Sequence, residues 1–188
     1  YYHVRATNAF VTIKTEVPME NPKIQTVVDI HPGALFHELE VADLLGVIFE
    51  GNPTHGHFVL SENWPEGIYP LRKDVKANQV KLVPTPASEK IKLPENERLV
   101  KIIIGPQHPA LLEPEKFAVT VDGEIVTKVE PRIGYVHRGI EKATESRTYL
   151  QDVYLVERIC GICNSIHACG FVEDVEKIGK IEVPERAK

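Results

Sequence analysis

A cysteine pair followed by a histidine is the strongest chemical signal in this sequence. Cys160 and Cys163 are separated by two residues, and His167 lies four positions further on. This spacing lets both sulfurs turn toward one centre, and Gly161 allows the backbone to approach it closely. Thiolates are soft donors for nickel, copper(I), zinc or iron, and we expect the nearby Arg158 to lower the thiol pKa. On a helix, His167 would point back toward Cys163 as a hydrogen-bonding partner or proton carrier.

The cysteine pair alone leaves the kind of site open. Taken by itself it favours zinc, but a structural zinc site generally has four ligands, and the sequence holds no second cysteine pair. His167 and Cys169 would have to complete such a site from one helix, which is an awkward geometry. A thioredoxin-type motif lies at a helix start in a βαβ unit, whereas the segment before Cys160 has helical patterning. Cys169 lies outside the motif, and we expect it to be a small buried helix residue.

The elements expected to position this motif are strands followed by helices. Apolar alternation predicts three strands, over residues 99–104, 117–121 and 124–129. Gly123 marks a hairpin turn between the last two of them. Helical apolar spacing then predicts three segments, over residues 140–149, 150–156 and 164–178. A break around Gly161 separates the last two, so the cysteine pair is expected between helices.

A linker divides the chain into two parts. Between Asp74 and Arg98 the composition turns to Lys, Pro, Asn and Ser, and the spacing of the prolines excludes a continuous helix or central strand. Before it, periodicity predicts two strands and one helix, over residues 9–17, 25–30 and 33–49. The predicted fold class is therefore α+β: a small α+β domain over residues 1–76, a linker over 77–97, and a hairpin leading into helices over 98–188.

Composition and charge exclude several classes of protein. With 188 residues, 43% of them hydrophobic, and a net charge of -5, the chain has no basic field to hold nucleic acid or an anionic bilayer. Its apolar runs are strand-sized, far short of the roughly 20 residues of a membrane helix, so we expect any membrane span in another subunit. The first residue is Tyr1 and not Met, which suggests a missing N-terminus. Three cysteines, two of them paired, fit a reducing compartment, the cytoplasm.

The run around the cysteines resembles a known metal motif. Arg158, Cys160, Gly161, Cys163 and His167 form the pattern Arg-x-Cys-Gly-x-Cys-x-x-x-His, which is similar to the N-terminal nickel motif of NiFe hydrogenase large subunits. The resemblance implies that Cys160 is a terminal nickel ligand and that Cys163 bridges nickel to an iron carrying cyanide and carbon monoxide. In that family a second cysteine pair completes the NiFe centre. Residues 1–188 lack such a pair, so we expect a fragment that is inactive alone.

Two upstream motifs resemble a narrower group. Residues 105–109 (Gly-Pro-Gln-His-Pro) and 134–142 (Gly-Tyr-Val-His-Arg-Gly-Ile-Glu-Lys) are similar to opening motifs of the complex I 49-kDa subunit and its hydrogenase relatives. In the complex I branch the cysteines are lost and a quinone histidine follows the first motif, at a place that falls here on Leu112. The resemblance therefore implies a hydrogenase. Glu141 corresponds to the family glutamate that takes protons from the metal site; the alternative is a carboxylate that offsets the helix dipole.

Two histidines of these motifs, His108 and His137, are expected to be hydrogen-bonded residues of turns. In the first part of the chain, residues 37–53 resemble the complex I 30-kDa subunit signature, and the likeness covers residues 7–76 with its end at Pro70-Leu71-Arg72-Lys73-Asp74. It implies a docking domain that packs against the catalytic subunit and its iron-sulfur partner. Glu40 and Asp43, three apart on the predicted helix, indicate a solvated or ion-paired face without a catalytic role.

The presence of both modules on one chain resembles the fused large subunits of formate hydrogenlyase-type, membrane-bound hydrogenases. The resemblance implies reversible reduction of protons to H2, with Glu141, Arg158 and His167 as catalytic residues. The implied partners are an iron-sulfur small subunit, membrane subunits, and H2 and protons as substrates, on the cytoplasmic face of a membrane and without nucleic acid. Two alternatives stay open. One is the large subunit of a related NADH:quinone or sulfur-reducing complex, and the other is a noncatalytic docking module with a zinc-type site or no metal.

Overall fold

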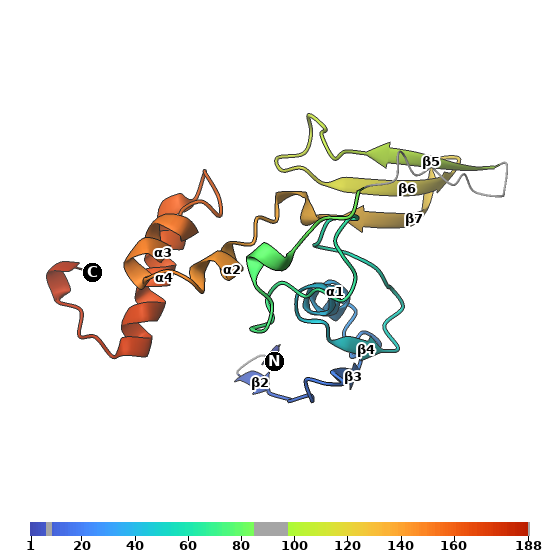
Figure 1. The fold of residues 1–188 in the computed structure, drawn as a ribbon. Helices are drawn as coiled ribbons and strands as arrows, with labels where there is room; N and C mark the ends of the chain where they lie inside the picture. Colours follow the sequence, from blue (N-terminus) through green and yellow to red (C-terminus); the bar gives the residue numbers. More distant parts are fainter. Residues whose placement is uncertain (7–8, 85–97, 188) are drawn as a thin grey trace.

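The computed structural model describes residues 1–6, 9–84 and 98–187. It contains an N-terminal part of short strands and one helix, a three-stranded antiparallel sheet, and a group of helices that lies to one side of the sheet (Figure 1). This arrangement confirms the predicted α+β class. Most of the predicted linker falls outside the described residues. Its first part holds a single 3-10 turn, η1 (Ala77–Gln79).

Two small sheets and a crossover helix form the N-terminal part. The strands β1 (Tyr2–Ala6) and β2 (Ala9–Ile13) pair antiparallel. The strands β3 (Lys23–Gln25) and β4 (Ile48–Glu50) pair in parallel. Parallel neighbours need a long crossover, and the helix α1 (Ala34–Leu45) supplies it. The N-terminal part therefore holds a β-α-β unit in addition to a hairpin.

The three predicted elements of this part all have different bounds in the structure. The strand expected over residues 9–17 ends at Ile13. The strand expected over residues 25–30 ends at Gln25, because the backbone N–H groups of Ile30 and His31 donate to the Val27 carbonyl, at 3.0 and 2.8 Å, and close a turn. The helix expected to continue to residue 49 ends at Gly46, which adopts a left-handed conformation with φ 77°. A Cβ at this glycine would lie 2.5 Å from the ring of Tyr69, so both space and backbone favour glycine.

A buried carboxylate on α1 organises the loop that follows β4. Asp43 is only 7% exposed. Its Oδ2 accepts hydrogen bonds from the backbone N–H groups of Phe58, Val59 and Leu60, at 2.8, 2.7 and 3.0 Å. Its Oδ1 lies 2.8 Å from Nδ1 of His57. We expected a solvated or ion-paired face at Asp43. The solvated alternative is wrong, because the carboxylate turns inward and accepts from three buried backbone N–H groups.

A second carboxylate of α1, Glu38, joins the helix to the chain before it and after it. It is 2% exposed. It accepts from the Thr26 hydroxyl at 2.6 Å, the Val27 N–H at 2.9 Å and the Asn52 amide at 3.0 Å. The phenol of Tyr2 donates to it at 3.4 Å, and burial together with this carboxylate raises the pKa of Tyr2. A charge buried this deeply is tolerated because its lone pairs are satisfied.

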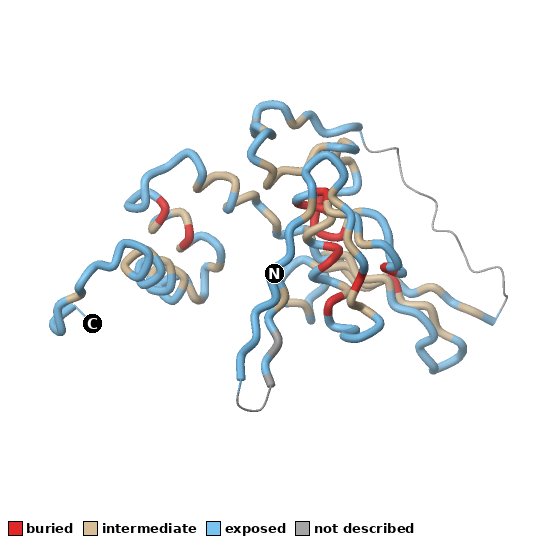
Figure 2. Tube along the Cα trace, turned by 90° about the horizontal axis from the view of Figure 1, so that it is seen from below, coloured by how far each residue is buried: buried red, intermediate tan, exposed pale blue. Residues whose placement is uncertain are grey.

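The apolar core of the chain lies next to these two carboxylates. Buried stretches, drawn red in Figure 2, gather mainly in the N-terminal part. The core cluster consists of five buried side chains with three partly buried neighbours: Leu39, Leu44, Phe58, Val59, Leu60, Leu35, Trp64 and Leu71. The loop held by Asp43 therefore contributes three of the five buried members.

The second part of the chain starts with a sheet whose strands follow one another in sequence. The strands β5 (Leu99–Ile104), β6 (Lys116–Asp122) and β7 (Ile125–Arg132) pair antiparallel in the order β5-β6-β7. Gly123, with φ 61°, forms the turn between β6 and β7. The three predicted strands and this turn are confirmed, and β7 extends three residues beyond its predicted end at residue 129.

Helical elements follow the sheet. They are η2 (Gly134–Val136), α2 (Ile140–Thr144), α3 (Tyr149–Val156) and α4 (Asn164–Gly179), with a final turn η3 (Glu185–Ala187). The helix predicted over residues 140–149 ends early, because Thr148 starts a new helix. Its hydroxyl accepts from the Gln151 N–H and the Gln151 side chain accepts from the Thr148 N–H, a capping box that fixes the start of α3. Among the described residues, none of the helices has the length and apolar character that crossing a bilayer requires.

Hydrogen bonds and close contacts join the N-terminal part to the second part. Arg132, at the end of β7, donates from Nη2 to the Leu60 carbonyl at 3.3 Å, and its Nε lies 3.8 Å from the Glu62 carboxylate. A Cβ at Gly134 would lie 1.7 Å from the Val59 carbonyl oxygen, so only glycine permits this approach. The two parts therefore meet at the end of the sheet, where the helical group begins.

Candidate metal centre

The cysteine pair lies in the turn between α3 and α4. After α3 ends, the N–H groups of Arg158 and Ile159 donate back to the carbonyls of Leu155 and Val156, and the chain then leaves the helix. Cys163 is the N-cap residue of α4. Both sulfur-bearing residues are half-buried. The predicted break around residue 161 is confirmed, and it places two thiols on one short turn.

The two thiols interact with each other. A hydrogen bond from the Cys163 thiol to the Cys160 sulfur lowers the pKa of Cys160, and the backbone N–H groups of Cys163 and Ile162 lower it further. The same hydrogen bond raises the pKa of Cys163. The turn therefore holds one sulfur that is stabilised as a thiolate beside one that is stabilised as a thiol. Sulfurs this close suit a single soft metal ion.

His167 lies one turn into α4 and contacts the second cysteine. Its Nε2 is 3.3 Å from Sγ of Cys163, and its backbone N–H donates to the Cys163 carbonyl at 3.3 Å. The predicted placement of His167 on the side of the cysteine is confirmed. Because residues four apart on a helix are neighbours, the histidine can orient this sulfur or exchange a proton with it.

Arg158 does not act on the thiols in the way that we expected. Its Nη1 is paired with the carboxylate of Glu157 and donates to the Tyr154 carbonyl at 3.0 Å, back along α3. The lowered pKa of Cys160 instead originates from Cys163 and from backbone amides. Because the Arg158 guanidinium bonds along its own helix, the thiolate form of Cys160 is stabilised by these nearer donors and not by Arg158. A role for Arg158 in catalysis stays a prediction.

A different arginine, Arg138, holds the backbone in front of the cysteines. Its Nη2 donates to the carbonyl of Ile159 at 2.9 Å and to the carbonyl of Arg158. Sequence reasoning missed this residue. Arg138 lies inside the motif over residues 134–142, but no spacing rule connects position 138 with a turn about 20 positions further on. Only the fold brings them together.

Glu141 lies in the first turn of α2, and its side chain is exposed. Its Oε2 is 3.8 Å from Nε2 of His137. Within the described part of the chain no hydrogen bond joins Glu141 to either cysteine, so the predicted proton role stays a prediction. The alternative role at a helix N-terminus agrees with its position.

The two motif histidines differ in how they are satisfied. Nδ1 of His108 accepts from the Ala110 N–H at 3.2 Å, as expected for a residue of a turn. Nε2 of His137 is shielded from solvent and has no hydrogen-bond partner within the described residues, so the expectation is wrong for this nitrogen. The cause is its position at the junction of the two parts, where neighbouring side chains cover it.

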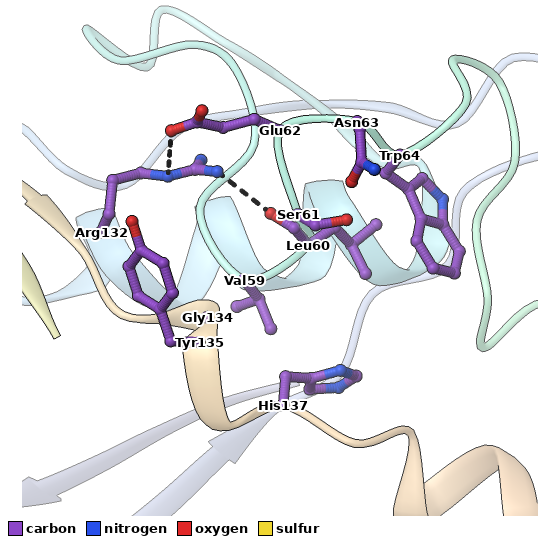
Figure 3. Close-up of a pocket in the computed structure, with 10 residues that line it drawn as sticks. All are labelled: Val59, Leu60, Ser61, Glu62, Asn63, Trp64, Arg132, Gly134, Tyr135 and His137. Carbon is purple, nitrogen blue, oxygen red and sulfur yellow. Dashed lines mark hydrogen bonds and ion pairs between the residues drawn. The ribbon is translucent and has the colours of Figure 1, made fainter. Parts of the chain in front are cut away.

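A cavity of about 370 Å³ opens at that junction and does not include the cysteines. Figure 3 shows Arg132 reaching across it to Glu62 and to the Leu60 carbonyl. Its lining comes from one segment of each part of the chain, residues 59–64 and 132–137. The cavity therefore belongs to the contact between the two parts, and the candidate metal site lies elsewhere, on the turn before α4.

Comparisons with known proteins agree with this division. The family described as "Respiratory-chain NADH dehydrogenase, 30 Kd subunit" matches residues 1–81, and the family described as "Nickel-dependent hydrogenase" matches residues 138–188. The first part of the chain is thus similar to a subunit of respiratory-chain NADH dehydrogenase, and its last part is similar to nickel-dependent hydrogenases. The cysteine turn lies wholly inside the hydrogenase match.

The relatives of the chain include subunits of hydrogenases and of NADH-quinone oxidoreductases. The chain is 36% identical over 189 residues to formate hydrogenlyase subunit 5 of Escherichia coli, covering 98% of this chain. It is 36% identical over 211 residues to the C/D subunit of NADH-quinone oxidoreductase from Bacteroides thetaiotaomicron, covering all of this chain and 39% of that relative. Over 92 residues, 49% of this chain and 22% of the relative, it is 49% identical to membrane-bound hydrogenase subunit alpha of Pyrococcus furiosus. The chain spans 33% of the length of the formate hydrogenlyase subunit.

The two sulfurs of the turn fit part of a metal site of the kind that a nickel-dependent hydrogenase would hold. In the described residues, no group of three or more His, Cys, Asp or Glu side chains is arranged to hold a metal ion. Two adjacent soft sulfurs match the thiolate ligands that nickel and iron accept, so the donor set fits as two ligands. Cys169 is exposed and takes no part in the pair. Our expectation that it is buried is wrong, because within the described residues α4 packs mainly against α3 and leaves this side open.

Proposed function

We propose that this chain is part of the catalytic large subunit of an energy-converting NiFe hydrogenase, which reversibly reduces protons to H2. The observation that carries the proposal is the pair of adjacent sulfurs, Cys160 and Cys163, on one turn within the residues that match nickel-dependent hydrogenases. Cys160 would be a terminal nickel ligand, and Cys163 would bridge nickel and iron, as the resemblance of the motif implies. The remaining ligands would come from parts of the whole protein outside residues 1–188.

The NiFe group, with cyanide and carbon monoxide on its iron, would supply the electron-rich metal pair at which H2 is split heterolytically. The chain's own residues would hold and prepare that site. His167 contacts the sulfur of Cys163 and would fix its orientation. Arg158, which lies two positions before Cys160 and is paired with Glu157, would hold the end of α3 from which the turn starts.

Glu141 would exchange protons with the surroundings of the site. Its carboxylate is exposed to solvent and lies 3.8 Å from the shielded Nε2 of His137. A carboxylate with one side toward water and one side toward an imidazole nitrogen without a hydrogen-bond partner is placed to pass protons between the two.

The partners would be those of the relatives' complexes. An iron-sulfur small subunit would deliver electrons, and membrane subunits would hold the complex on the cytoplasmic face of the membrane. The N-terminal part would dock these partners, in agreement with its match to the 30-kDa subunit of a respiratory complex. H2 and protons would be the substrates.

The test uses the whole parent protein, isolated anaerobically. We expect the wild type to contain about one nickel per polypeptide and to reduce a viologen dye with H2. Cys160→Ser should lower that rate at least about 100-fold and remove the nickel, because a hydroxyl is a poor replacement for a soft thiolate. Cys169→Ser is the matched control, because Cys169 is exposed and lies outside the pair, and it should keep both properties.

The part played by the rest of the protein has its own measurement. Residues 1–188, purified alone, should bind no stoichiometric nickel-iron centre, because the described residues bring together only two thiols in one turn. Hydrogen uptake by these residues alone, with one nickel bound, would contradict the proposal. So would a wild-type parent that carries no nickel.

A second candidate function is quinone reduction, which the match to C/D subunits of NADH-quinone oxidoreductases favours. The residues argue for the hydrogenase. At the place of the quinone histidine of that branch this chain has Leu112, which is 98% exposed and offers no hydrogen bond to a quinone headgroup. Quinone reductase activity in a nickel-free parent protein would select this alternative. Zinc bound to the parent, with unfolding of Cys160→Ser, would select a docking module with a structural site.

A further inference from the structure

We propose that Arg138 is a positioning residue that fixes the turn carrying Cys160, and that residues 134–142, the connecting segment, tie this turn to the N-terminal part. Its effect on the metal rests on the proposed function, whereas its effect on the turn does not. Through the connecting segment, the position of the N-terminal part would thus determine where the metal ligands lie.

The contacts of Arg138 are directed at two neighbouring carbonyls. Nη2 donates to the carbonyl of Ile159 at 2.9 Å and to that of Arg158. Both carbonyls follow the end of α3, where helices leave their last acceptors without partners. Among the described residues no other hydrogen bond reaches them. A guanidinium presents several donors in one rigid plane, so it can satisfy two adjacent acceptors at once.

The geometry of the peptide bond carries this contact to the cysteine. The carbonyl of Ile159 and the N–H of Cys160 belong to one planar peptide group. Fixing the direction of that carbonyl therefore fixes the plane from which the Cα–Cβ bond of Cys160 departs. Arg138 would in this way set where the sulfur of Cys160 points without touching it.

Apolar packing contributes little to this turn. In the helical group the buried side chains are Asp152 and Val156, and both belong to α3. Ile159 and Ile162, on either side of Cys160, are exposed. A turn without a core around it relies on hydrogen bonds for its conformation, and the two bonds from Arg138 are charge-assisted.

The connecting segment rests on the N-terminal part at both ends. At its start, Gly134 lies so close to the Val59 carbonyl that a Cβ would come within 1.7 Å of the oxygen. At its end, the ammonium of Lys142 donates to the Arg72 carbonyl at 2.9 Å. Val59 is itself fixed by the buried Asp43. A displacement of the docking module would therefore move the base from which Arg138 reaches the turn.

The first readout needs no metal. Hydrogen exchange by mass spectrometry on the parent protein would follow the peptide that covers residues 157–168. We expect Arg138→Gln to raise its exchange rate about tenfold or more, the size of a lost hydrogen bond to a charged group. Arg138→Lys keeps the charge and should recover part of the protection. The matched control is Arg147→Gln, since Arg147 also donates to a carbonyl, that of Ala143, but away from the turn, and it should leave this peptide unchanged.

The second readout reports on the metal site. In the nickel-loaded parent, the infrared bands of the iron-bound carbon monoxide and cyanide should shift or broaden in Arg138→Gln and return toward wild type in Arg138→Lys. Unchanged exchange together with unchanged bands would overturn the role of Arg138 and leave the proposed function standing. Raised exchange in a parent that never contains nickel would support the role in the turn and overturn the proposed function.

The link to the docking module is tested at a distance from Arg138. Gly134→Ala forces the segment away from Val59 and should raise exchange of the same peptide, by a smaller factor than Arg138→Gln. Lys142→Gln, which gives up the contact with Arg72, is the milder second variant in case Gly134→Ala does not fold. Unchanged exchange in Lys142→Gln and in any folded Gly134→Ala would overturn the link.

Discussion

The N-terminal part and the helical group differ in how they are held together. In the N-terminal part, five buried apolar side chains from α1 and the loop after β4 pack together, and two buried carboxylates accept hydrogen bonds from the surrounding amides and hydroxyls. In the helical group, α3 supplies one buried apolar residue, Val156, and α4 supplies none. The N-terminal part is thus stabilised by its own interior, whereas the candidate metal site lies on helices with little interior of their own.

Large apolar side chains on the helical group make the difference sharper. Four of them are strongly exposed: Leu150, Ile162, Ile166 and Ile178. The comparison teaches that the fold of the first part is encoded in its own residues. The cysteine turn depends on a few directed hydrogen bonds.

The largest effect should come from removing the carboxylate at the centre of the N-terminal part. Asp43→Ala leaves three buried N–H groups and His57 without their acceptor, so we expect a loss of about 4 kcal/mol in the free energy of unfolding. Urea denaturation followed by the fluorescence of Trp64, which packs on this core, measures it. Glu40→Ala on the exposed face of the same helix is the control and should cost about 0.5 kcal/mol or less. A loss of under about 1 kcal/mol for Asp43→Ala would break the comparison.

The next effect compares one apolar residue from each region. Leu44 is buried in the core, and Ile166 on α4 is 72% exposed. Leu44→Ala should cost about 3 kcal/mol of unfolding free energy through lost transfer energy and a cavity. Ile166→Ala should cost about 0.5 kcal/mol or less in residues 1–188. Equal losses of unfolding free energy in the two variants would show that α4 has an interior of its own, and this would contradict the comparison.

A smaller effect tests the local start of α3. Thr148→Ala removes the hydroxyl that accepts from the Gln151 N–H, and such a cap is worth about 1 kcal/mol. Thr148→Ser keeps the hydroxyl and should restore the stability. Far-ultraviolet circular dichroism during denaturation reports the helices, and the fluorescence of Trp64 should not change its midpoint if the two regions are stabilised independently.

The smallest effect concerns the sheet between the two regions. Lys101 and Lys128 pair with Glu130 and lower its pKa from 4.5 to about 2. A depressed folded-state pKa stabilises the fold above pH 4.5, and this contribution is lost as the pH falls toward 2. Because the side chain of Glu130 is 43% exposed, solvent screening keeps the gain below about 1 kcal/mol. Glu130→Gln should flatten the dependence of stability on pH between 4.5 and 2, and a wild-type NMR titration with a midpoint near 4.5 would contradict the pairing.

Much of the fold was predictable because local patterns decide it. Apolar alternation and Gly123 defined the hairpin of β6 and β7, and the three-strand sheet followed. The break between α2 and α3 also had a local signal, the Thr148 and Gln151 capping box. We predicted a helix over residues 140–149 from apolar periodicity alone and did not use this signal. Capping residues can therefore correct a periodicity that runs across two helices.

The candidate site was predictable only where its residues are close in sequence. Cys160, Cys163 and His167 lie within one turn and the start of one helix, so spacing was enough to bring them together. Arg138 reaches the same turn through the fold, and Asp43 turns inward because a distant loop presents three amides to it. Contacts of this kind depend on tertiary geometry, which a pattern of residue types in one sequence does not contain.

The most direct test of the central claim is nickel K-edge X-ray absorption on the parent protein with Cys160 replaced by selenocysteine. The selenium would identify this one position among all the sulfurs around the metal. If Cys160 binds nickel, the spectrum will contain a selenium scatterer at bonding distance from nickel. A nickel site with sulfur, nitrogen or oxygen neighbours but no selenium would contradict the account.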